Sequence, residues 1–350
     1  MKKIAYIELD THAEIALNFM ELMNDSKVFS VDYYFSEKIL RFFGYTQNDK
    51  LPENIKKATP ENLIQQLSTD NYQLIIIGTV HRNFNVFEKI AEKFNTSIIC
   101  HNLNFVKVSN FDLLSSIFKE DFQFRLKLLL KEGLLRKSYV YKKAKNLLVL
   151  DENLTKENYS NLPLFYTKFF EKPDNETFTI VIPGAVSQKR RNYDKIIKEL
   201  SISTSLNVTK FEIIFLGKAQ GKELEMLQNF EQNKPENIFI KYFTEKVPQD
   251  VFDDYMQKAN ILWCPIQQET EFFSQKEIYG ITKMSGNIGD AIKFGKLAIF
   301  PENYPSKYAF IISEKVSLED ALFVKKEIDF SDFNKEKVLK QLEKTIFALL

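Results

Sequence analysis

Cysteine and histidine are scarce in this chain of 350 residues, which holds two of the former and three of the latter. Cys100 and Cys264 lie in apolar runs and lack the spacing of a disulfide framework or of a metal site, so we expect buried thiols and a cytoplasmic protein. None of the histidines stands at metal-ligand spacing from another. No catalytic metal is therefore expected.

An excess of charge of one sign and long apolar runs are lacking as well. The formal net charge is only +1, so no overall field attracts nucleic acid or a membrane, and no nucleic-acid-binding module is recognisable. No uncharged apolar run approaches the roughly 18 residues that cross a bilayer, and the run from Ile4 to Ile7 ends at Glu8, too early for a signal peptide. Any membrane contact is expected from the surface.

The chain also has no dinucleotide fingerprint. Because Gly-x-Gly-x-x-Gly follows the first expected strand of neither half, a Rossmann dehydrogenase is disfavoured. What the chain does have is the composition of an ordered globular protein, with 44% hydrophobic and 27% charged residues. Its length favours two domains of about 150 residues each.

Short apolar runs alternate with stretches of helical period, which indicates βα units built around parallel sheets. Strands are expected at 4–9, 30–35, 74–78, 97–100 and 146–150, and again at 179–182, 211–216, 238–242, 261–264 and 297–300. Helices are expected at 12–24, 83–94, 192–200, 221–232, 248–258, 287–294 and 334–350. The polar, turn-rich segment 166–177 separates the two series and is predicted to be a linker.

Two strands of the second half end on glycine, which allows a ligand to approach the backbone closely. Gly184 is followed by Lys189, Arg190 and Arg191, cations that can hold a diphosphate through charge-assisted hydrogen bonds. A solvated basic loop is the alternative. Gly217 closes the next strand, either beneath a base or ribose or simply as a turn residue.

The turn Ser285-Gly286-Asn287 stands at the start of the expected helix 287–294. Small, cap-competent residues leave backbone N–H groups free at a helix start, where the helix dipole also favours an anion. Lys283 adds a positive charge, Asp290 lies one turn inside and can face a ribose hydroxyl, and Gly295 ends the helix. An ordinary capped helix between two strands is the alternative.

All three histidines follow expected strands of the first half, in Asp10-Thr11-His12, Thr79-Val80-His81-Arg82 and His101-Asn102. Open α/β sheets bind ligands at the carboxyl ends of their strands, so these residues are expected at the edge of a cleft. A structural or surface role is the alternative for each histidine.

In their order and spacing, the loops of residues 178–300 resemble the C-terminal domain of GT-B-fold glycosyltransferases, most closely the retaining family-four enzymes (glycosyl transferases group 1). The resemblance rests on Gly184 with Lys189 or Arg190, on Leu216-Gly217-Lys218, and on the stretch from Asp290 to Lys296. The chain departs from the family at three positions. Ala185 replaces the arginine beside the glycine, and Thr282 and Asp290 replace the two glutamates of the Glu-x7-Glu motif.

The resemblance implies two Rossmann-like, doubly wound α/β domains that face a cleft. These are an acceptor-side domain over 1–165, the linker over 166–177 and a nucleotide-sugar-binding domain over 178–333, with helix 334–350 available to pack on the first. The implied reaction moves a sugar from a UDP- or GDP-sugar to a hydroxyl of a glycan or lipid-linked acceptor, with retention and without a metal or further cofactor. Such a reaction belongs to polysaccharide or glycoconjugate biosynthesis.

The resemblance also assigns roles, with His101 at the position that faces the donor sugar in the family. The expected catalytic residues are His101 and Asp290; the expected donor contacts are Gly184, Lys189, Arg190, Gly217, Thr282, Lys283, Ser285, Gly286 and Asn287; the expected acceptor-side residues are Asp10, His12, His81 and Asn102. The altered motif leaves open a catalytically silent nucleotide-sugar-binding or partner protein. An epimerase on the same fold needs a pair of acid and base carboxylates that the sequence does not place.

The most basic stretch covers residues 125–145, where leucines at helical spacing stand among lysines and arginines. This pattern suits an interfacial helix at the inner face of an anionic membrane. An amphipathic helix that covers its own sheet is the alternative. Nucleic acid is not expected as a partner.

Overall fold

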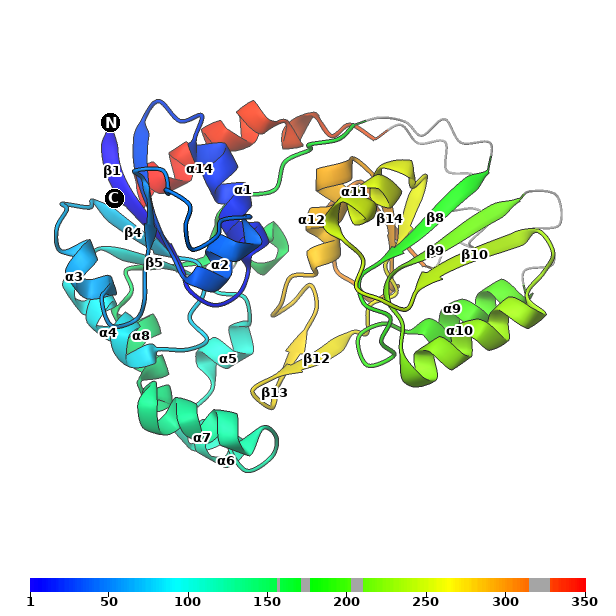
Figure 1. The fold of residues 1–350 in the computed structure, drawn as a ribbon, viewed down its shortest axis with the longest axis horizontal. Coiled ribbons are helices and arrows are strands. Elements are labelled where there is room, and N and C mark those ends of the chain that lie inside the picture. The colour runs from blue at the N-terminus through cyan, green and yellow to red at the C-terminus, as the bar shows by residue number, and fades with distance from the viewer. Residues whose placement is uncertain (156–157, 171–176, 203–209, 315–327) are drawn as a thin grey trace.

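The computed structural model describes residues 1–155, 158–170, 177–202, 210–314 and 328–350. Over these ranges the chain forms two lobes that lie side by side, each built around a parallel sheet, and both chain termini lie on the first lobe (Figure 1). The expected α/β fold class with two doubly wound domains is confirmed.

The first lobe holds a sheet whose strand order, within the described ranges, is β3-β2-β1-β4-β5-β6-β7, and every pairing is parallel. Its strands are β1 (Lys2–Glu8), β2 (Phe29–Phe35), β3 (Ile55–Lys57), β4 (Leu74–Ile77), β5 (Thr96–Ile99), β6 (Asn146–Val149) and β7 (Ser160–Asn161). The strand order reverses between β1 and β4. Sheets of this kind form a ligand crevice at such a point, outside the carboxyl ends of the strands.

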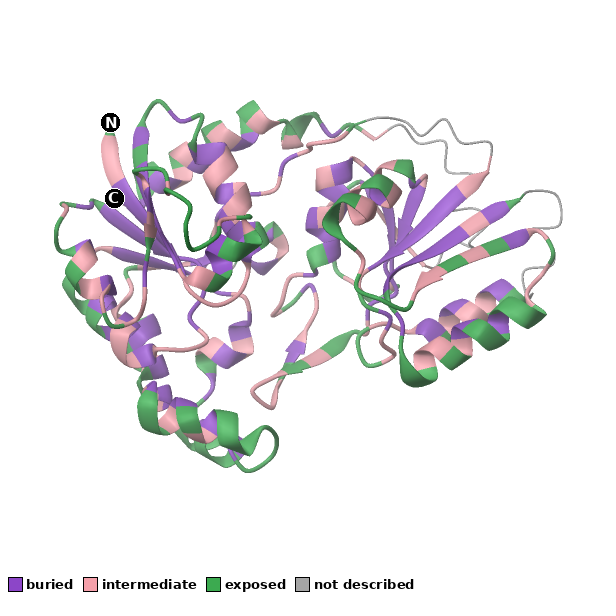
Figure 2. Ribbon diagram, viewed as in Figure 1, coloured by how far each residue is buried: buried purple, intermediate pink, exposed green. Residues whose placement is uncertain are grey.

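Helices cover both faces of this sheet. They are α1 (Ala13–Met23), α2 (Glu37–Phe42), α3 (Leu63–Leu67), α4 (Phe84–Lys93), α5 (Leu103–Lys107), α6 (Asn110–Ser116), α7 (Phe122–Lys131) and α8 (Lys137–Lys143), with short turns η1 (Leu134–Arg136) and η2 (Glu152–Leu154). Along β1, Ile4 and Tyr6 belong to one apolar cluster and Ala5 and Ile7 to the other. Because both faces are covered, the central strands β4 and β5 and most of β1 and β2 are buried, as their purple colour in Figure 2 shows.

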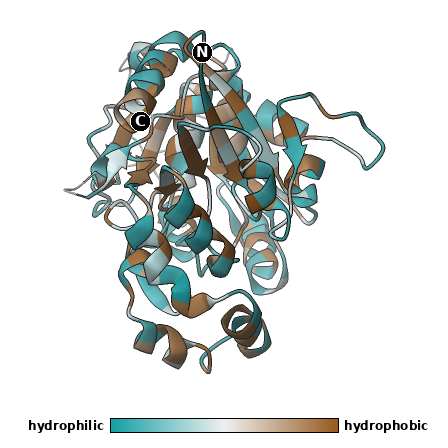
Figure 3. Ribbon diagram, turned by 90° about the vertical axis from the view of Figure 1, so that its left-hand side faces the viewer, coloured by the Kyte–Doolittle hydropathy of each residue, from teal (hydrophilic) through white to brown (hydrophobic). Residues whose placement is uncertain are grey.

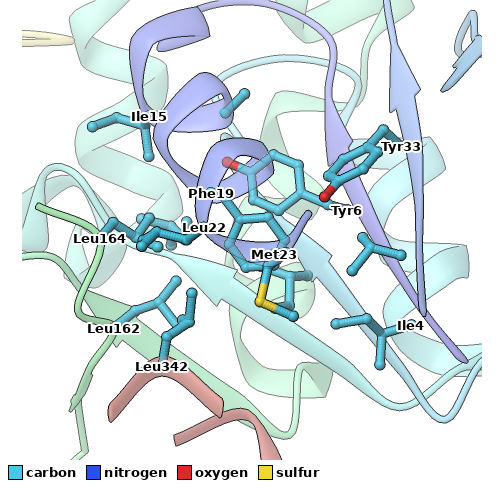
Figure 4. Packing of buried hydrophobic residues seen from close by; sticks show 14 of the residues in the cluster. Ile4, Tyr6, Ile15, Phe19, Leu22, Met23, Tyr33, Leu162, Leu164 and Leu342 are labelled. Carbon is cyan, nitrogen blue, oxygen red and sulfur yellow. The ribbon is translucent and has the colours of Figure 1, made fainter. Parts of the chain in front are cut away.

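The last helix, α14 (Lys335–Ala348), packs on the first lobe although it follows the second sheet in the chain. Its residues Val338, Leu342 and Ile346 join the cluster in which the rings of Tyr6 and Phe19 stack 4.5 Å apart (Figure 4). The helix expected at 334–350 is therefore confirmed, and its apolar face is covered by α1 and the first sheet.

The second lobe holds a sheet of order β10-β9-β8-β11-β14-β15 in the described part of the chain, again parallel throughout. Its strands are β8 (Phe178–Pro183), β9 (Phe211–Lys218), β10 (Ile238–Phe243), β11 (Ile261–Trp263), β14 (Leu297–Phe300) and β15 (Ile311–Ser313). Its helices are α9 (Tyr193–Ile202), α10 (Gly221–Asn233), α11 (Gln249–Lys258) and α12 (Gly286–Phe294), and η4 (Ser331–Phe333) precedes α14. The order reverses between β8 and β11, so the second crevice lies above these strands.

The domain boundaries at 165 and 178 stay predictions. Of the expected linker, residues 171–176 lie outside the described ranges. Near it, Phe165 packs against the clusters of both lobes, and a Cβ on Gly289 of α12 would stand 2.6 Å from its ring. Gly289 therefore permits close packing of the two lobes at this point.

A hairpin of β12 (Glu269–Phe272) and β13 (Gln275–Ile278) leaves the second lobe and reaches the first (Figure 1). The sequence analysis did not predict it. At its tip, Phe272 and Phe273 pack against the first lobe, and Ser274 accepts a hydrogen bond of 2.8 Å from Arg125. Phe273 and Ser274 have φ of 51° and 55°, a conformation that such residues rarely adopt without tertiary contacts.

The basic segment 125–145 is not one helix. It contains most of α7, then η1, then α8, and its residues Leu128, Leu134 and Val140 are buried in the first lobe. Even Lys137 is buried, where its ammonium donates to the carbonyls of Phe105, Val106 and Val108. The two buried leucines and Val140 therefore cover their own sheet, as in the alternative interpretation, whereas Leu130 and Tyr139 of the same segment are exposed. Membrane contact through this segment stays a prediction.

Candidate active site

The three histidines come together at the carboxyl ends of β1, β4 and β5, which are neighbours in the first sheet. The rings of His12 and His101 stack with centroids 3.8 Å apart, and the ring of His81 lies 6.2 Å from the first and 6.1 Å from the second. His101 contacts the carbonyl of Gly78 through Nε2 at 2.8 Å. Burial holds the pKa of His101 well below its ordinary value and lowers that of His81 to about 3. Both rings are therefore neutral at pH 7.

Beneath the histidines lies Glu8, the last residue of β1, whose side chain is fully buried. Its Oε1 accepts hydrogen bonds from the N–H groups of Asp10 and Thr11 at 3.0 and 3.2 Å, and its Oε2 accepts one from the Thr79 hydroxyl at 2.6 Å. These contacts join the turn after β1 to the turn after β4 and hold His12 in a left-handed conformation, with φ of 57°. Glu8 thus positions the cluster.

Burial raises the pKa of Glu8 to about 7, from an ordinary value of 4.5. The folded protein therefore keeps this proton over a pH range in which the unfolded chain has released it. The free energy of unfolding should fall by up to about 3 kcal/mol as the pH rises from 5 to 7 and stay reduced above 7. Because glutamine imitates the neutral carboxyl, Glu8→Gln should be more stable than the parent at pH 8 and about equal to it at pH 5.

Urea unfolding across this pH range measures the effect, and Glu53→Gln, at an exposed position of the same lobe, is the matched control. If the free energies of unfolding of the parent and of Glu8→Gln change in parallel from pH 5 to 8, Glu8 is ionised throughout this range.

The two lobes touch directly beside the histidines. Lys283 of the second lobe donates to Oδ1 of Asn102 at 2.6 Å, and the Asn102 amide lies 3.4 Å from Nε2 of His81. Next to this contact, the N–H of Leu103 donates to the carbonyl of Thr282 at 2.9 Å. Burial lowers the pKa of Lys283. A lysine of the expected donor side thus meets an asparagine of the expected acceptor side.

The same contact is reinforced by Glu277 of β13, a fully buried carboxylate. It accepts hydrogen bonds from the N–H groups of Asn104 and Phe105, at 3.2 and 2.8 Å, in the first turn of α5. A carboxylate at a helix start satisfies free N–H groups and is favoured by the helix dipole. Glu277 therefore fixes the loop that carries Lys283 to the first lobe.

Helix α12 begins at Gly286, directly after the capping residue Ser285, so the sequence correctly predicted a helix start in this turn. The hydroxyl of Ser285 accepts a hydrogen bond of 3.3 Å from the N–H of Asn287, Gly286 is exposed, and Gly295 ends the helix with φ of 58°. Asp290 accepts a hydrogen bond of 3.1 Å from the Asn287 amide. Burial raises the pKa of Asp290 to about 6, and Glu14 at the start of α1 acts in the same direction from the other lobe.

Arg191 is the cation that reaches this helix start. Its guanidinium lies 3.2 Å from the carbonyl of Ala185 and 3.5 Å from Oδ1 of Asn287, while its buried Nε has no hydrogen-bond partner among the described residues. A Cβ on Gly184 would stand 2.3 Å from this guanidinium. The glycine therefore leaves the space that the arginine occupies between the β8 turn and α12.

The remaining expected donor contacts lie in different settings. Lys189 and Arg190 are exposed on the same loop. The Thr282 hydroxyl accepts a hydrogen bond of 2.8 Å from the N–H of Ile278 and so closes a local turn. Gly217 lies against the backbone of Gly184, which joins the turns after β8 and β9.

A cavity of about 300 Å³ opens beside the Arg191 loop. The loops that follow β11 and β14 line it together with the start of α9, and its polar residues include Asn192, Lys195, Gln267, Gln268, Tyr279, Asn303, Tyr304 and Glu314. Lys195 forms an ion pair with Glu314 inside it. Amide and phenol groups of this kind suit a ligand rich in hydroxyl groups.

Comparisons with known proteins rest on structure alone, since no family model and no curated protein matches the sequence. The UDP-GlcNAc 2-epimerase from Methanocaldococcus jannaschii superposes with a TM-score of 0.55 at 10% identity, covering 99% of both chains. The lipopolysaccharide outer core galactosyltransferase WaaB superposes with a TM-score of 0.55 at 12% identity, covering 99% of this chain and 100% of its own. The pneumococcal O-GlcNAc transferase GtfA superposes with a TM-score of 0.54 at 10% identity, covering 99% of both chains.

The fold is GT-B. These likenesses cover nearly the whole of both chains, so the two lobes, and not one sheet alone, correspond to the neighbours. In this GT-B chain Asn102, which lies beside His81 in the first lobe, contacts Lys283 of the second. Among the described residues, no helix is long and apolar enough to span a membrane, and no group of three acidic, histidine or cysteine side chains can hold a metal ion.

Three positioning residues of this GT-B site were missed from the sequence. Glu8 and Glu277 resemble ordinary strand residues. For Glu8, a carboxylate at the end of an apolar parallel strand is a usable signal, but Glu277 lies in a polar strand of an antiparallel hairpin and has none. Arg191 belongs to the basic run, but the sequence analysis assigns the donor contacts to its neighbours Lys189 and Arg190.

Proposed function

We propose that this protein is a glycosyltransferase that uses a nucleotide-sugar donor, whose diphosphate lies between the start of α12 and the guanidinium of Arg191. The main supporting observation is that the guanidinium of Arg191 lies 3.5 Å from Oδ1 of Asn287 and has an unpaired Nε, while Gly286 is exposed at the helix start. A helix start and a guanidinium are both well suited to bind an anion.

Charge develops on the leaving diphosphate when the bond to the sugar breaks. The fixed N–H of the exposed Gly286, and the charges of Arg191 and Lys283, would stabilise that charge without having to reorganise. His101 would face the sugar with its neutral ring, and Asp290 would meet a ribose hydroxyl. The contact of Lys283 with Asn102 would keep water away from the reacting carbon, because water competes with the acceptor. We further propose retention of the anomeric configuration and a glycan or lipid-linked hydroxyl as acceptor.

Ligand binding tests the donor site. UDP, GDP and their sugars, at about 100 times their dissociation constants, should each raise the free energy of unfolding by about 2.7 kcal/mol if they bind. The matched ligands are UMP and GMP, which should shift the thermal midpoint much less because they lack the second phosphate. The donor-site proposal fails if no nucleoside diphosphate or nucleotide sugar shifts the midpoint.

A silent GT-B protein remains the second candidate, favoured by Ala185 and by a Thr282 hydroxyl that is already used within its own turn. Release of nucleoside diphosphate from the sugar that binds best, with and without an acceptor extract, separates the two. Binding without any release of nucleoside diphosphate would favour the silent protein.

A further inference from the structure

An exposed apolar surface covers the end of the first lobe formed by α6 and α7. We call it the phenylalanine knob and define it as Phe111, Leu114, Phe118, Phe122 and Leu130. Phe111, Phe118 and Leu130 are 80%, 79% and 73% exposed, more than any other large apolar side chain in the described ranges except Met1. Side chains of this size are exposed singly on many proteins, but a cluster requires an explanation.

The members of the knob form one continuous surface. Phe111, Leu114 and Phe118 are three and four residues apart and share a face of α6 and the turn that follows it. Phe122 and Leu130 stand two turns apart on α7. The rings of Phe118 and Phe122 lie 5.8 Å apart and join the two rows. Figure 3 shows hydrophobic residues on these helices at the end of the lobe.

The segment that carries this surface has an excess of positive charge. Residues 107–145 contain ten lysines and arginines and four carboxylates, a net charge of +6, in a chain whose net charge is +1. The rest of the chain therefore carries −5. Of the cations in the segment, Arg125 and Lys137 are buried, and Arg136 and Lys143 pair with Glu88. On or beside the knob, Lys119, Lys127 and Lys131 are exposed together with the carboxylates of Asp112, Glu120 and Asp121.

The exposed apolar side chains and the excess of cations together favour an anionic bilayer over a second copy of the chain as the partner of this surface. In a symmetric dimer the same surface faces its own copy, so two segments of net charge +6 would oppose each other. An anionic bilayer accepts the aromatic rings among its acyl chains and the cations at its headgroups. We propose that the phenylalanine knob inserts into the surface of an anionic lipid bilayer. The proposal goes beyond the proposed function and does not depend on the donor site.

The knob is also close in sequence to the contact between the two lobes. Asn102, which contacts Lys283, is separated from the start of α6 only by α5 and a two-residue turn. A bilayer held at the knob would therefore lie near the acceptor side of the site. This placement differs from the sequence prediction of an interfacial helix over 125–145, because Leu128 and Leu134 of that segment are buried and only its Leu130 belongs to the knob.

Vesicle sedimentation with the full chain tests the proposal. The protein should pellet with vesicles of equal parts phosphatidylcholine and phosphatidylglycerol, and about tenfold less with phosphatidylcholine alone or in high salt. Phe111→Ser with Phe118→Ser should reduce partition into the anionic vesicles by about tenfold or more. The matched control is Phe42→Ser with Phe239→Ser, two phenylalanines that are 56% and 48% exposed elsewhere. This control should partition like the parent.

A second measurement reports insertion directly. Trp263 is the only tryptophan and is buried in β11 of the second lobe, so Phe118→Trp adds one reporter at the knob. Its emission should shift to the blue on anionic vesicles and be quenched by brominated acyl chains. No vesicle binding by the parent, equal partition into neutral vesicles, or unchanged binding of the double serine variant would each overturn the proposal. Formation of a dimer through the knob, without binding to vesicles, would also overturn it.

Discussion

Replacing Gly217 by alanine should lower the free energy of unfolding by about 3 kcal/mol, at the upper end of what an added methyl group costs in a packed site. The new Cβ would stand 2.3 Å from the carbonyl oxygen of Gly184, 2.5 Å from its carbonyl carbon and 2.7 Å from the nitrogen of Ala185. These are backbone atoms of the turn after β8, which cannot rotate away as a side chain can. The turn must shift, and the Arg191 site that it supports shifts with it.

Urea unfolding followed by the fluorescence of Trp263 measures this loss, because that residue is buried in the second sheet next to β8. The matched control is Gly286→Ala. Space around Gly286 is open to 4 Å and its φ is ordinary, so alanine there should change stability by less than about 1 kcal/mol, and in the stabilising direction. Equal stability of the two variants would mean that the turns after β8 and β9 do not touch in solution.

Much of this fold could be predicted because parallel strands are buried on both faces. Runs such as 74–77 and 213–216 are apolar throughout, and so their composition alone indicates strands. The short strands β3 and β7 carry no such pattern. The β12–β13 hairpin is hidden for another reason. Its turn is Phe273-Ser274, and both residues have positive φ. Contacts with the first lobe maintain this conformation, and the turn lacks the Asn-Gly or Gly residues that usually predict a hairpin.

The site could be predicted in part for a related reason. Residues that follow parallel strands gather at one edge, and this rule correctly predicted that the three histidines lie together, beside the Asn102 that contacts Lys283. The rule cannot say which of three successive cations turns inward. That is decided by the loop after β11, where Arg191 bridges to Ile266 and the N–H of Asn192 donates to the carbonyl of Pro265. Such pairing is a tertiary contact without a local signal.

Arg191 is therefore the residue whose loss should harm the proposed reaction most. Arg191→Ala should lower kcat/KM for the nucleotide sugar by about 100-fold or more, because a preorganised donor to the developing diphosphate charge is removed. Arg191→Lys keeps the charge but not the planar fork and should recover only part of the rate. The release of nucleoside diphosphate measures both variants, and urea unfolding verifies that each remains folded.

The control for a removed guanidinium is Arg41→Ala on α2, an exposed residue of the other lobe that pairs with Glu37 and should leave kcat/KM unchanged. Lys189→Ala with Arg190→Ala tests the two neighbours that are exposed on the loop. Since an exposed cation is screened by water and salt, this pair should weaken donor binding less than Arg191→Ala alone. The reverse order of effects would place the diphosphate on the outer side of the loop, with Arg191 serving only to link the β8 turn to α12.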